Sequence, residues 1–223
     1  MPRLVAFGCS NTFGMGLDDC WDPVKRVPGE HPSQFAWPAA LGNILKRQTV
    51  NLSRAGSSNR EILWRILNNY NIYNETDIVV ILWTFKTRYA IITEPGQLFP
   101  TQLFSNLTKM NVESEYYKTY KARTFDEYDS AIESLHFIDY ADRFLKDKVK
   151  HVMNYVCDHT MLDINELYTQ VKIIGKPYEL NVGKPANDGS HPGPESHFNF
   201  ANRIVKDLNN LRKTNIIKEL KSA

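Results

Sequence analysis

The stretch Leu4-Val5-Ala6-Phe7-Gly8-Cys9-Ser10-Asn11-Thr12-Phe13-Gly14 is an apolar run that ends in small polar residues. Its first part, Leu4 to Phe7, has the length and character of a strand buried on both faces of a parallel sheet. Gly8 and Gly14 bracket a tight turn, so Ser10 is expected just beyond the carboxyl end of that strand. Ligands of open α/β sheets bind in the crevice at this end. The stretch alone fits either a nucleophilic serine or an ordinary turn serine.

A second stretch, Asp188-Gly189-Ser190-His191-Pro192-Gly193-Pro194, offers the base that a serine nucleophile needs. A hydroxyl becomes a good nucleophile when an imidazole removes its proton and a third group orients the imidazole. Asp188 stands three residues before His191 in a Gly/Pro-rich turn, so the carboxylate can fold back onto the ring. A capped turn without chemistry is the alternative. Apolar residues at helical spacing then predict a closing amphipathic helix: Phe198, Ala201, Ile204, Val205, Leu208 and Leu211.

Together these two stretches resemble the blocks of the SGNH (GDSL-type) hydrolase family. The resemblance implies a serine esterase on a flavodoxin-like, mostly parallel sheet within a three-layer α/β/α sandwich. It assigns the nucleophile to Ser10, the base to His191 and the orienting carboxylate to Asp188. The first block here is Gly8-Cys9-Ser10, with cysteine where the family usually has aspartate.

The middle blocks of the family match less well. The segment Asn51-Leu52-Ser53-Arg54-Ala55-Gly56-Ser57-Ser58-Asn59 is similar to the second block, which implies that the backbone N–H groups of Gly56 and Ser10 form the oxyanion hole. The third block should fall at Ile81-Leu82-Trp83-Thr84-Phe85-Lys86, but the asparagine that supplies a further donor is missing. Thr84 and Arg88 are candidates to replace it or to contact substrate. Alternatively, Thr84 is only a hydroxyl at the end of a strand, and Arg88 is a structural arginine.

Two rival assignments stay open within the site. Cys9 adjoins Ser10, and a thiolate is a better nucleophile than a hydroxyl. Adjacent residues on an extended segment point to opposite sides, so only one of them can face the histidine, and the family resemblance selects Ser10. His197 is a rival base close to the turn; it lines the site or caps the last helix.

Composition narrows the class of protein. At 223 residues the chain is expected to form one domain, 1–223, around one core. The net charge of +2 leaves no excess of basic residues for neutralising phosphates, so a nucleic-acid partner is not expected. The six histidines lack metal-ligand spacing, and no glycine-rich phosphate fingerprint is present, so no metal and no cofactor are predicted.

Cysteine usage and the amino terminus bear on location. The chain has three cysteines, an odd number that lacks both metal-ligand spacing and a dense disulfide framework. This usage fits a reducing compartment. The start of the chain reads directly into the first strand, and no stretch has the ~20 apolar residues that span a bilayer. These features predict cytoplasmic synthesis without a signal peptide, and no membrane partner.

Hydrophobic periodicity predicts alternating helices and strands. Helices are expected over 37–45 and from Asn59 to Tyr70, and strands over 49–52 and 77–83. A helix is expected over 137–158, although Tyr155 to Cys157 also fits a strand, and 172–174 is expected to form a late short strand. The order of elements predicts a doubly wound α/β sheet.

Two irregular segments are expected to border the substrate. Residues 17–35 form a long loop, and residues 93–138 an aromatic-rich insertion over the strand ends. Aromatic rings also stack on sugars. We therefore expect a small acyl ester as substrate, such as an O-acetyl group on a carbohydrate. The resemblance extends to bacteriophage proteins, which would make the protein virion-associated. The alternative is a binding or structural protein on a catalytically degraded SGNH fold.

Overall fold

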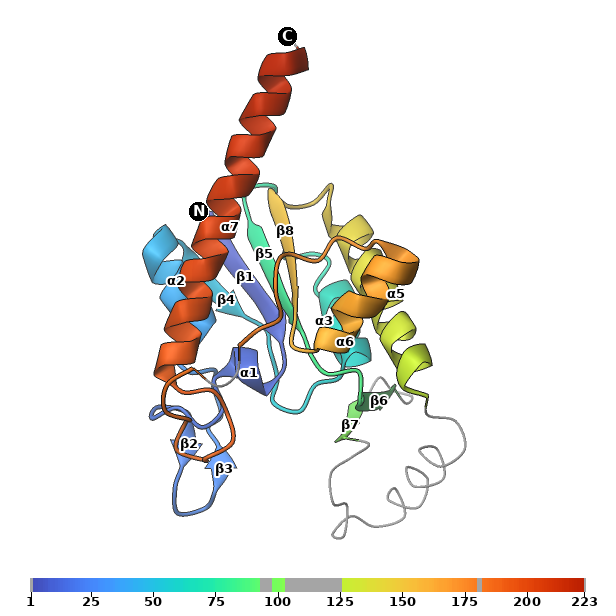
Figure 1. Ribbon diagram of the computed structural model, residues 1–223. Helices are drawn as coiled ribbons and strands as arrows, with labels where there is room; N and C mark the ends of the chain where they lie inside the picture. The colour runs from blue at the N-terminus through green and yellow to red at the C-terminus, as the bar shows by residue number, and fades with distance from the viewer. Residues whose placement is uncertain (1, 93–97, 103–125, 180–181, 223) are drawn as a thin grey trace.

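The computed structural model describes residues 2–92, 98–102, 126–179 and 182–222. Four parallel strands form the central sheet in the order β4-β1-β5-β8. They are β1 (Arg3–Gly8), β4 (Gln48–Asn51), β5 (Ile78–Trp83) and β8 (His151–Val156). Helices cover both faces of the sheet (Figure 1). The predicted α/β class, with a mostly parallel sheet between two helical layers, is confirmed.

The two central strands carry the longest apolar runs of the sheet. All six residues of β5 are buried, and β1 is buried from Leu4 onward. Parallel pairing sets Leu4 opposite Ile78 and Gly8 opposite Leu82. A strand between two helical layers has no polar face, which explains why neither run alternates. Both strands therefore deliver their carboxyl ends to the same edge of the sheet.

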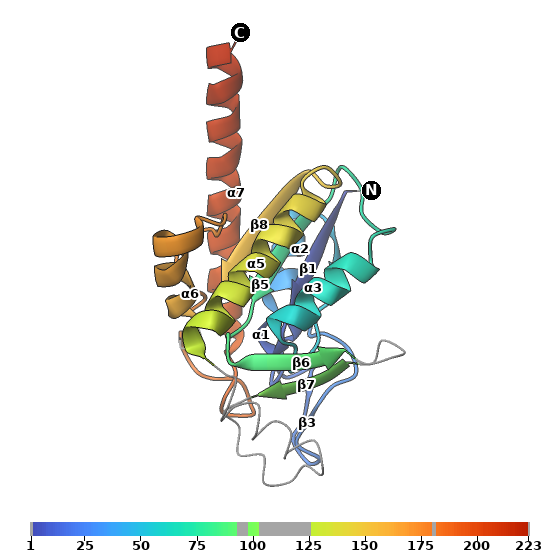
Figure 2. The same ribbon diagram turned by 90° about the vertical axis from the view of Figure 1, so that its right-hand side faces the viewer.

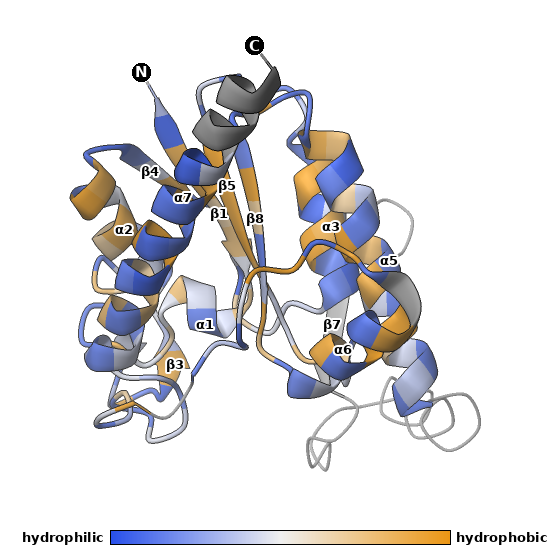
Figure 3. Ribbon diagram, turned by 45° about the horizontal axis from the view of Figure 1, so that its top comes forward, coloured by the Kyte–Doolittle hydropathy of each residue, from blue (hydrophilic) through white to orange (hydrophobic). Residues whose placement is uncertain are grey.

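One face of the sheet packs against α2 (Trp37–Leu45) and α7 (Pro194–Ser222). Side chains at alternate positions of the strands, such as Leu4, Ala6 and Val80, meet Trp37 and the buried stripe of α7. Hydrophobic residues accordingly concentrate in β1, β5 and β8 and on helix sides that face them (Figure 3).

The other face packs against α3 (Asn59–Asn68) and α5 (Glu127–Leu145). Val5, Phe7 and Ile81 point to this side and meet Ile62 of α3. Ser58 caps α3 by accepting a hydrogen bond from the backbone N–H of Glu61 at 3.2 Å. A serine followed three residues later by a glutamate is a typical helix start.

Several short elements gather at the end of the molecule where the parallel strands finish. They are α1 (Ser10–Phe13), the β2–β3 pair (Trp21–Asp22 and Val27–Pro28) and the β6–β7 pair (Arg88–Ile92 and Leu98–Gln102). Figure 1 and Figure 2 both place these elements at one end, while the carboxyl-terminal part of α7 extends from the opposite end. Ligands of this fold class bind at the first of these ends.

The chain beyond β8 returns along the outer edge of the sheet. After α6 (His159–Ile164) and the π-helix η1 (Asn165–Thr169), the backbone N–H of Ile174 donates to the carbonyl of Asn154 at 2.8 Å. Tyr178 donates in the same way to Val156 at 2.9 Å. The expected strand at 172–174 is thus a segment beside β8 with no regular strand assignment.

The helix predicted over 137–158 is wrong in its second half. Helix α5 runs from Glu127 to Leu145, and β8 occupies His151–Val156. The apolar residues that suggested helical spacing lie in a short continuous run buried on both faces, and periodicity cannot separate such a strand from a buried helix. The competing strand interpretation was the better one.

The early start of α5 also changes the outline of the predicted insertion. Residues 127–138 belong to a helix of the sheet-covering layer. Residues 93–97 and 103–125 of the predicted insertion lie outside the described part of the chain.

The closing helix is confirmed, but one of its predicted apolar-face residues is misplaced. Phe198 is exposed, whereas His197, Phe200, Ala201 and Ile204 are buried. Residues one position apart are separated by about 100° around a helix, which puts Phe198 outside the stripe that these four define. Phe200 instead packs edge-on against Trp37, with ring centroids 5.3 Å apart.

Candidate active site

Ser10 begins α1, directly after the turn that follows β1. The side chain is 2% exposed, and its Oγ is buried with no hydrogen-bond partner. It is therefore not hydrogen-bonded to His191 in this conformation. Catalytic hydrogen bonds often form only once substrate is bound, so this geometry does not exclude a nucleophile.

Asp188 and His191 form a close pair in the closing turn. The Asp188 Oδ2 contacts Nδ1 of the His191 ring, and Oδ1 accepts hydrogen bonds from the backbone N–H groups of Ser190 at 3.1 Å and His191 at 3.0 Å. Burial raises the pKa of Asp188, but these two N–H groups and the imidazole outweigh it and hold the pKa below its usual range. The carboxylate is thus charged and turned toward Nδ1, which leaves Nε2 of His191 for a serine proton.

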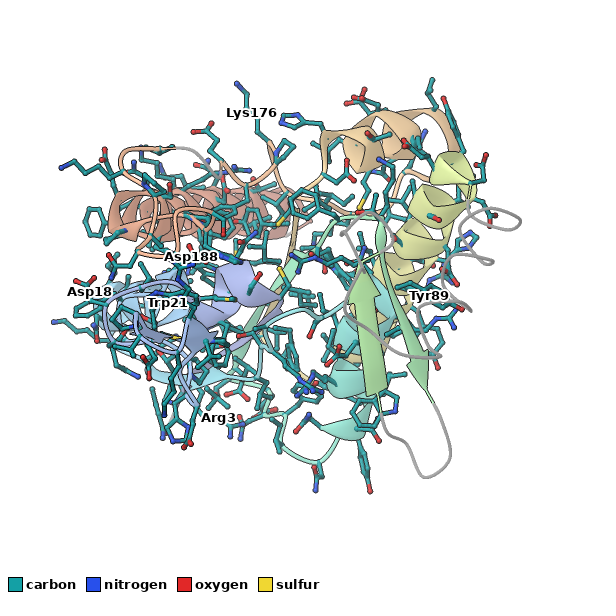
Figure 4. The ribbon with its side chains drawn as sticks, turned by 90° about the horizontal axis from the view of Figure 1, so that it is seen from below. Arg3, Asp18, Trp21, Tyr89, Lys176 and Asp188 are labelled. Atoms are coloured by element: carbon teal, nitrogen blue, oxygen red, sulfur yellow. The ribbon has the colours of Figure 1, made fainter. Side chains whose placement is uncertain are left out.

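The turn docks onto the loop that follows Ser10. The backbone N–H of Asn187 donates to the carbonyl of Gly16 at 2.8 Å, and its side chain donates to Asp18 at 2.7 Å. A Cβ on Gly16 would lie 2.7 Å from Asp188 Oδ1, so the turn packs directly on the glycine backbone. Figure 4 places Asp18 and Asp188 on the α1 side of the molecule, away from Tyr89. The turn that carries the Asp188–His191 pair therefore packs against the loop that directly follows the Ser10 stretch.

Gly56 lies in a turn attached to the end of β1. The backbone N–H of Arg54 donates to the carbonyl of Gly8 at 3.3 Å, which holds this turn beside the strand exit. Gly56 has a φ of +83°, and no atom lies within 4 Å of the position where a Cβ would be. Among the described residues, the N–H groups of Gly56 and Ser10 have no acceptor. Two free donors at one strand end fit the oxyanion hole that the family resemblance implies.

Thr84 follows β5 and is held by Asn59. The Asn59 side chain accepts from the backbone N–H of Thr84 at 2.7 Å and donates to its carbonyl at 3.1 Å and to Ser134 Oγ at 3.0 Å. Because these three hydrogen bonds occupy the Asn59 side chain, Asn59 does not replace the asparagine that is missing from the third block. Thr84 is fully buried, and its hydroxyl lies beside the Cys9 thiol, whose pKa is lowered mainly by Cys157 and further by this hydroxyl.

Arg88 opens β6 after the turn that follows Thr84. Its backbone N–H donates to the carbonyl of Phe85 at 3.1 Å, and its guanidinium lies 5.8 Å from the centre of the Phe85 ring. The Nη1 atom is buried and has no hydrogen-bond partner. Arg88 thus remains a candidate to contact an anion or an oxyanion.

Cys9 points away from solvent and lies near a second thiol. Cys9 is fully buried, and its thiol interacts with Cys157 at the end of β8. This hydrogen bond and burial raise the pKa of Cys157 well above its usual range. Asn11 also contacts Cys157, with Nδ2 3.6 Å from Sγ. The hydrogen bond between the two thiols lowers the pKa of Cys9 well below its usual range, so Cys9 stays a rival to Ser10 as nucleophile, although its side chain is fully buried.

His197 is buried in the first turns of α7. Its Nδ1 accepts a hydrogen bond from the backbone N–H of Trp37 at 3.1 Å, while Nε2 has no partner. Burial lowers the pKa of His197 to about 4, and the charge of His191 adds to this effect. The ring is thus neutral and joins α7 to α2, which argues against the predicted contact with substrate.

No cluster of three or more potential metal-ligand side chains occurs among the described residues, and none of their helices could cross a membrane. A cavity of about 710 Å³ lies between Tyr178, Val182 and α7. None of the predicted site residues lines it, so the strand ends and not this cavity are the candidate site.

Sequence reasoning missed the residues that position the site. Gly16 supports Asp188, and Asn59 fixes the backbone of Thr84. Gly16 stands in Gly14-Met15-Gly16, where a glycine indicates a turn but not the distant segment that packs on it. No local pattern could have shown these long-range contacts.

No protein-family model matches the sequence, and no curated protein sequence is similar enough to count as a match. Solved structures do match. The acetyl xylan esterase Est2A from the rumen bacterium Butyrivibrio proteoclasticus is 13% identical with a TM-score of 0.58, over 95% of this chain and 64% of that one. A family two carbohydrate esterase from Clostridium thermocellum, in complex with cellohexaose, is 15% identical with a TM-score of 0.56, over 95% and 65%.

A third match is a carbohydrate esterase family 2 enzyme with a carbohydrate-binding domain from Corynascus thermopiles (Myceliophthora fergusii). It is 11% identical with a TM-score of 0.58, over 93% of this chain and 67% of that chain. The chain spans 64–65% of the length of the first two structures in the comparison. At these identities the similarity shows the fold alone. The chain therefore shares the α/β fold of these carbohydrate esterases, as the SGNH resemblance implied.

Proposed function

We propose that this protein is a serine esterase in which Ser10, His191 and Asp188 form the catalytic triad. The observation that carries the proposal is the docking of the Asp188–His191 pair, through Asn187, onto Gly16 in the loop after Ser10. This contact supports the proposal, because a triad needs a hydroxyl, an imidazole and a charged carboxylate from residues some 180 positions apart at one end of the sheet.

The reaction proceeds by two acyl transfers. His191 Nε2 takes the proton of Ser10 as Oγ attacks the ester carbonyl, and Asp188 stabilises the imidazolium that forms. The N–H groups of Ser10 and Gly56 donate to the oxyanion. The imidazolium returns its proton to the leaving alcohol, which leaves an acyl-serine. A water molecule, deprotonated by His191, then releases the acid and restores the hydroxyl.

Because the asparagine that supplies a third donor to the oxyanion hole is missing, turnover is expected to be low unless another group replaces it. Loss of one such donor costs about 100- to 1000-fold in a serine hydrolase. Thr84 lies at the strand end where the family's asparagine should follow, and its hydroxyl lies beside Cys9, the residue before Ser10. We infer that Thr84 is the better replacement of the two predicted candidates, because the carbonyl and N–H of its backbone are already fixed by Asn59.

The proposed substrate is an acyl ester on a carbohydrate. Support comes from the three structural matches, whose titles name carbohydrate esterases, one of them an acetyl xylan esterase and one in complex with cellohexaose. One further match, with a TM-score of 0.55, is a carbohydrate esterase whose title ascribes both catalytic and non-catalytic binding functions to its active site. The second candidate function is therefore carbohydrate binding without turnover, favoured here by the missing third-block asparagine.

A fluorophosphonate probe tests the proposal, because it reacts with activated serines. The wild-type protein and the Ser10→Ala and Ser57→Ala variants are incubated with the probe, and hydrolysis of p-nitrophenyl acetate is measured in parallel. Ser57 is the matched control, since its hydroxyl is also buried and unpartnered.

We expect labelling and hydrolysis in the wild type and in Ser57→Ala, and neither in Ser10→Ala. Folded wild-type protein that takes up no probe contradicts the esterase proposal. If it also binds cellohexaose, carbohydrate binding without turnover becomes the better assignment.

A further inference from the structure

Arg88 differs from Arg3, Arg60 and Arg65, which each pair with a carboxylate. Asp77 pairs with Arg3 at 2.6 Å, Glu133 with Arg60 at 2.7 Å and Glu61 with Arg65 at 3.2 Å. Among the described residues Arg88 has no ion pair, although its Nη1 is withdrawn from water. Burying part of a guanidinium without an acceptor is unfavourable.

Nearby acidic groups are already occupied by another cation. Lys86, two residues earlier, lies 3.3 Å from Asp158 and 3.7 Å from Glu127. The side chains of Lys86 and Asp158 are only 7% and 11% exposed, so this pair is held in place. The chain therefore neutralises Lys86 and leaves Arg88 without an anion.

The position of Arg88 relates its charge to the catalytic serine. The hydrogen bond between Cys9 and Cys157 lowers the pKa of Cys9 and raises that of Cys157, and the positive charge of Arg88 adds to the first shift and opposes the second. Cys9 is the residue before Ser10, and Cys157 contacts Asn11, the residue after it. The guanidinium thus acts on the strand ends from which Ser10 projects.

We propose that Arg88 binds a carboxylate of the substrate, so that the preferred ester is acidic. This inference rests on the proposed esterase function and specifies its substrate class. The planar guanidinium presents paired N–H donors that match the two oxygens of a carboxylate. Such a ligand supplies the acceptor that Nη1 lacks, and the acidic substrate gains a contact that a neutral ester cannot make.

Matched esters measure this preference. The probes are 3-acetoxybenzoate and 3-acetoxybenzamide, which share shape and scissile bond but differ by one negative charge. Their kcat/KM values are compared in the wild type, Arg88→Met, Arg88→Lys and Arg143→Met. Arg143 is the control, because it lies on the exposed side of α5 and its loss changes the net charge equally.

We expect the wild type and Arg143→Met to prefer the carboxylate by at least about tenfold, the size of a charged hydrogen bond. Arg88→Met should bring the ratio of the two kcat/KM values close to one, mainly through KM, and Arg88→Lys should retain part of it. A wild type without preference, or a ratio unchanged in Arg88→Met, overturns the inference.

A binding measurement separates this inference from the esterase proposal. In the Ser10→Ala background, 3-hydroxybenzoate should raise the unfolding temperature, and adding Arg88→Met should abolish the rise. Arg88-dependent stabilisation without any Ser10-dependent hydrolysis supports the carboxylate site and contradicts the esterase. Ser10-dependent hydrolysis with neither preference nor stabilisation retains the esterase and rejects the role of Arg88.

Discussion

The two ends of the central sheet treat their buried polar groups differently. At the amino ends, the fully buried Asp77 accepts hydrogen bonds from Arg3 through Nη2 at 2.6 Å and Nε at 3.2 Å, and from the backbone N–H of Asn74 at 3.0 Å. Arg47 completes this end by donating to the carbonyls of Arg3 at 3.2 Å and Thr76 at 2.8 Å. The charged groups Asp77, Arg3 and Arg47 there each have a partner. Among the described side chains at this end, Nε2 of His151 at the start of β8 is buried without one.

At the carboxyl ends, several polar atoms are buried without any partner. They belong to Ser10, Thr12 and Arg88. An unpaired buried donor or acceptor costs about 1–3 kcal/mol, so stability alone does not favour this arrangement. Buried polar groups without a partner are typical of a site whose hydrogen bonds a ligand completes. Under the esterase proposal, the amino ends of the strands have a structural role and the carboxyl ends a functional one.

Removing the Ser10 hydroxyl should give the largest loss of activity and no loss of stability. We expect Ser10→Ala to lower kcat by at least about 1000-fold, because the proposed acyl intermediate forms on this hydroxyl. The free energy of unfolding should stay the same or rise by up to about 1–3 kcal/mol, since the buried hydroxyl has no partner to lose. Ester hydrolysis and urea unfolding measure the two quantities. A large loss of stability would show that the Ser10 hydroxyl has a structural role, like the buried groups at the amino ends of the strands.

At the amino ends of the strands, removing a buried charge is expected to lower stability and leave activity unchanged. Asp77→Ala leaves Arg3 unpaired and should lower the free energy of unfolding by about 3–4 kcal/mol, the lower half of the range for buried pairs because Arg3 is 25% exposed. Turnover per folded molecule should stay unchanged. The folded fraction is determined by circular dichroism and used to normalise kcat. A fall in the normalised kcat would remove the distinction between the two ends.

The lowered pKa of His197 predicts that the protein loses stability in acid. This pKa is about 4 in the folded protein and 6.5 without burial, so as the pH falls the unfolded chain takes up the proton first. The contribution of the neutral ring is complete above about pH 6.5 and is lost between pH 6.5 and 4. With about 1.4 kcal/mol for each pH unit, the loss reaches roughly 3 kcal/mol.

Unfolding free energies of wild type and His197→Asn, measured from pH 7 to pH 4, test this expectation. Asparagine retains an acceptor for the N–H of Trp37 but does not titrate. The variant should therefore show a flatter profile in this range. Parallel profiles for the two proteins would mean that His197 is already protonated or accessible in the folded state.

Gly16→Ala should disturb the site without affecting the opposite end. The added Cβ would lie 2.7 Å from Asp188 Oδ1, and Gly16 has a φ of +88°. We expect a loss of about 100-fold in kcat, the effect of a displacement near 1 Å in a catalytic group. Gly189→Ala is the matched control, because its φ of +72° carries the same backbone penalty while no atom lies within 4 Å of the new Cβ. Equal losses in both variants would attribute the effect to backbone strain.

Much of the fold could be predicted because its signals are local. The helix over Trp37–Leu45 was predicted at its observed bounds, and the strand at Ile78–Trp83 within one residue. Their apolar runs have the length and period of one element only. The run around Val152 to Val156 fits both a buried strand and a helix, so its assignment depended on its neighbours in the sheet.

The site was predicted at the level of residue types and not of contacts. Sequence spacing could place Asp188 beside His191, because a short turn joins them. It could not show that Gly16 supports this turn or that His197 bonds to Trp37, 160 residues away. Such contacts depend on how the helical layers pack, which is a property of the whole chain.

The segment that returns beside β8 has a further consequence. An open strand edge offers a template to which another polypeptide can add by backbone pairing, and long exposed edges invite aggregation. Ile174 and Tyr178 occupy the outward carbonyls of Asn154 and Val156, so this side of the sheet cannot recruit a foreign strand. The opposite margin is β4, whose four residues give an incoming chain little length to hold. The protein thus protects one border by covering it and the other by keeping it short.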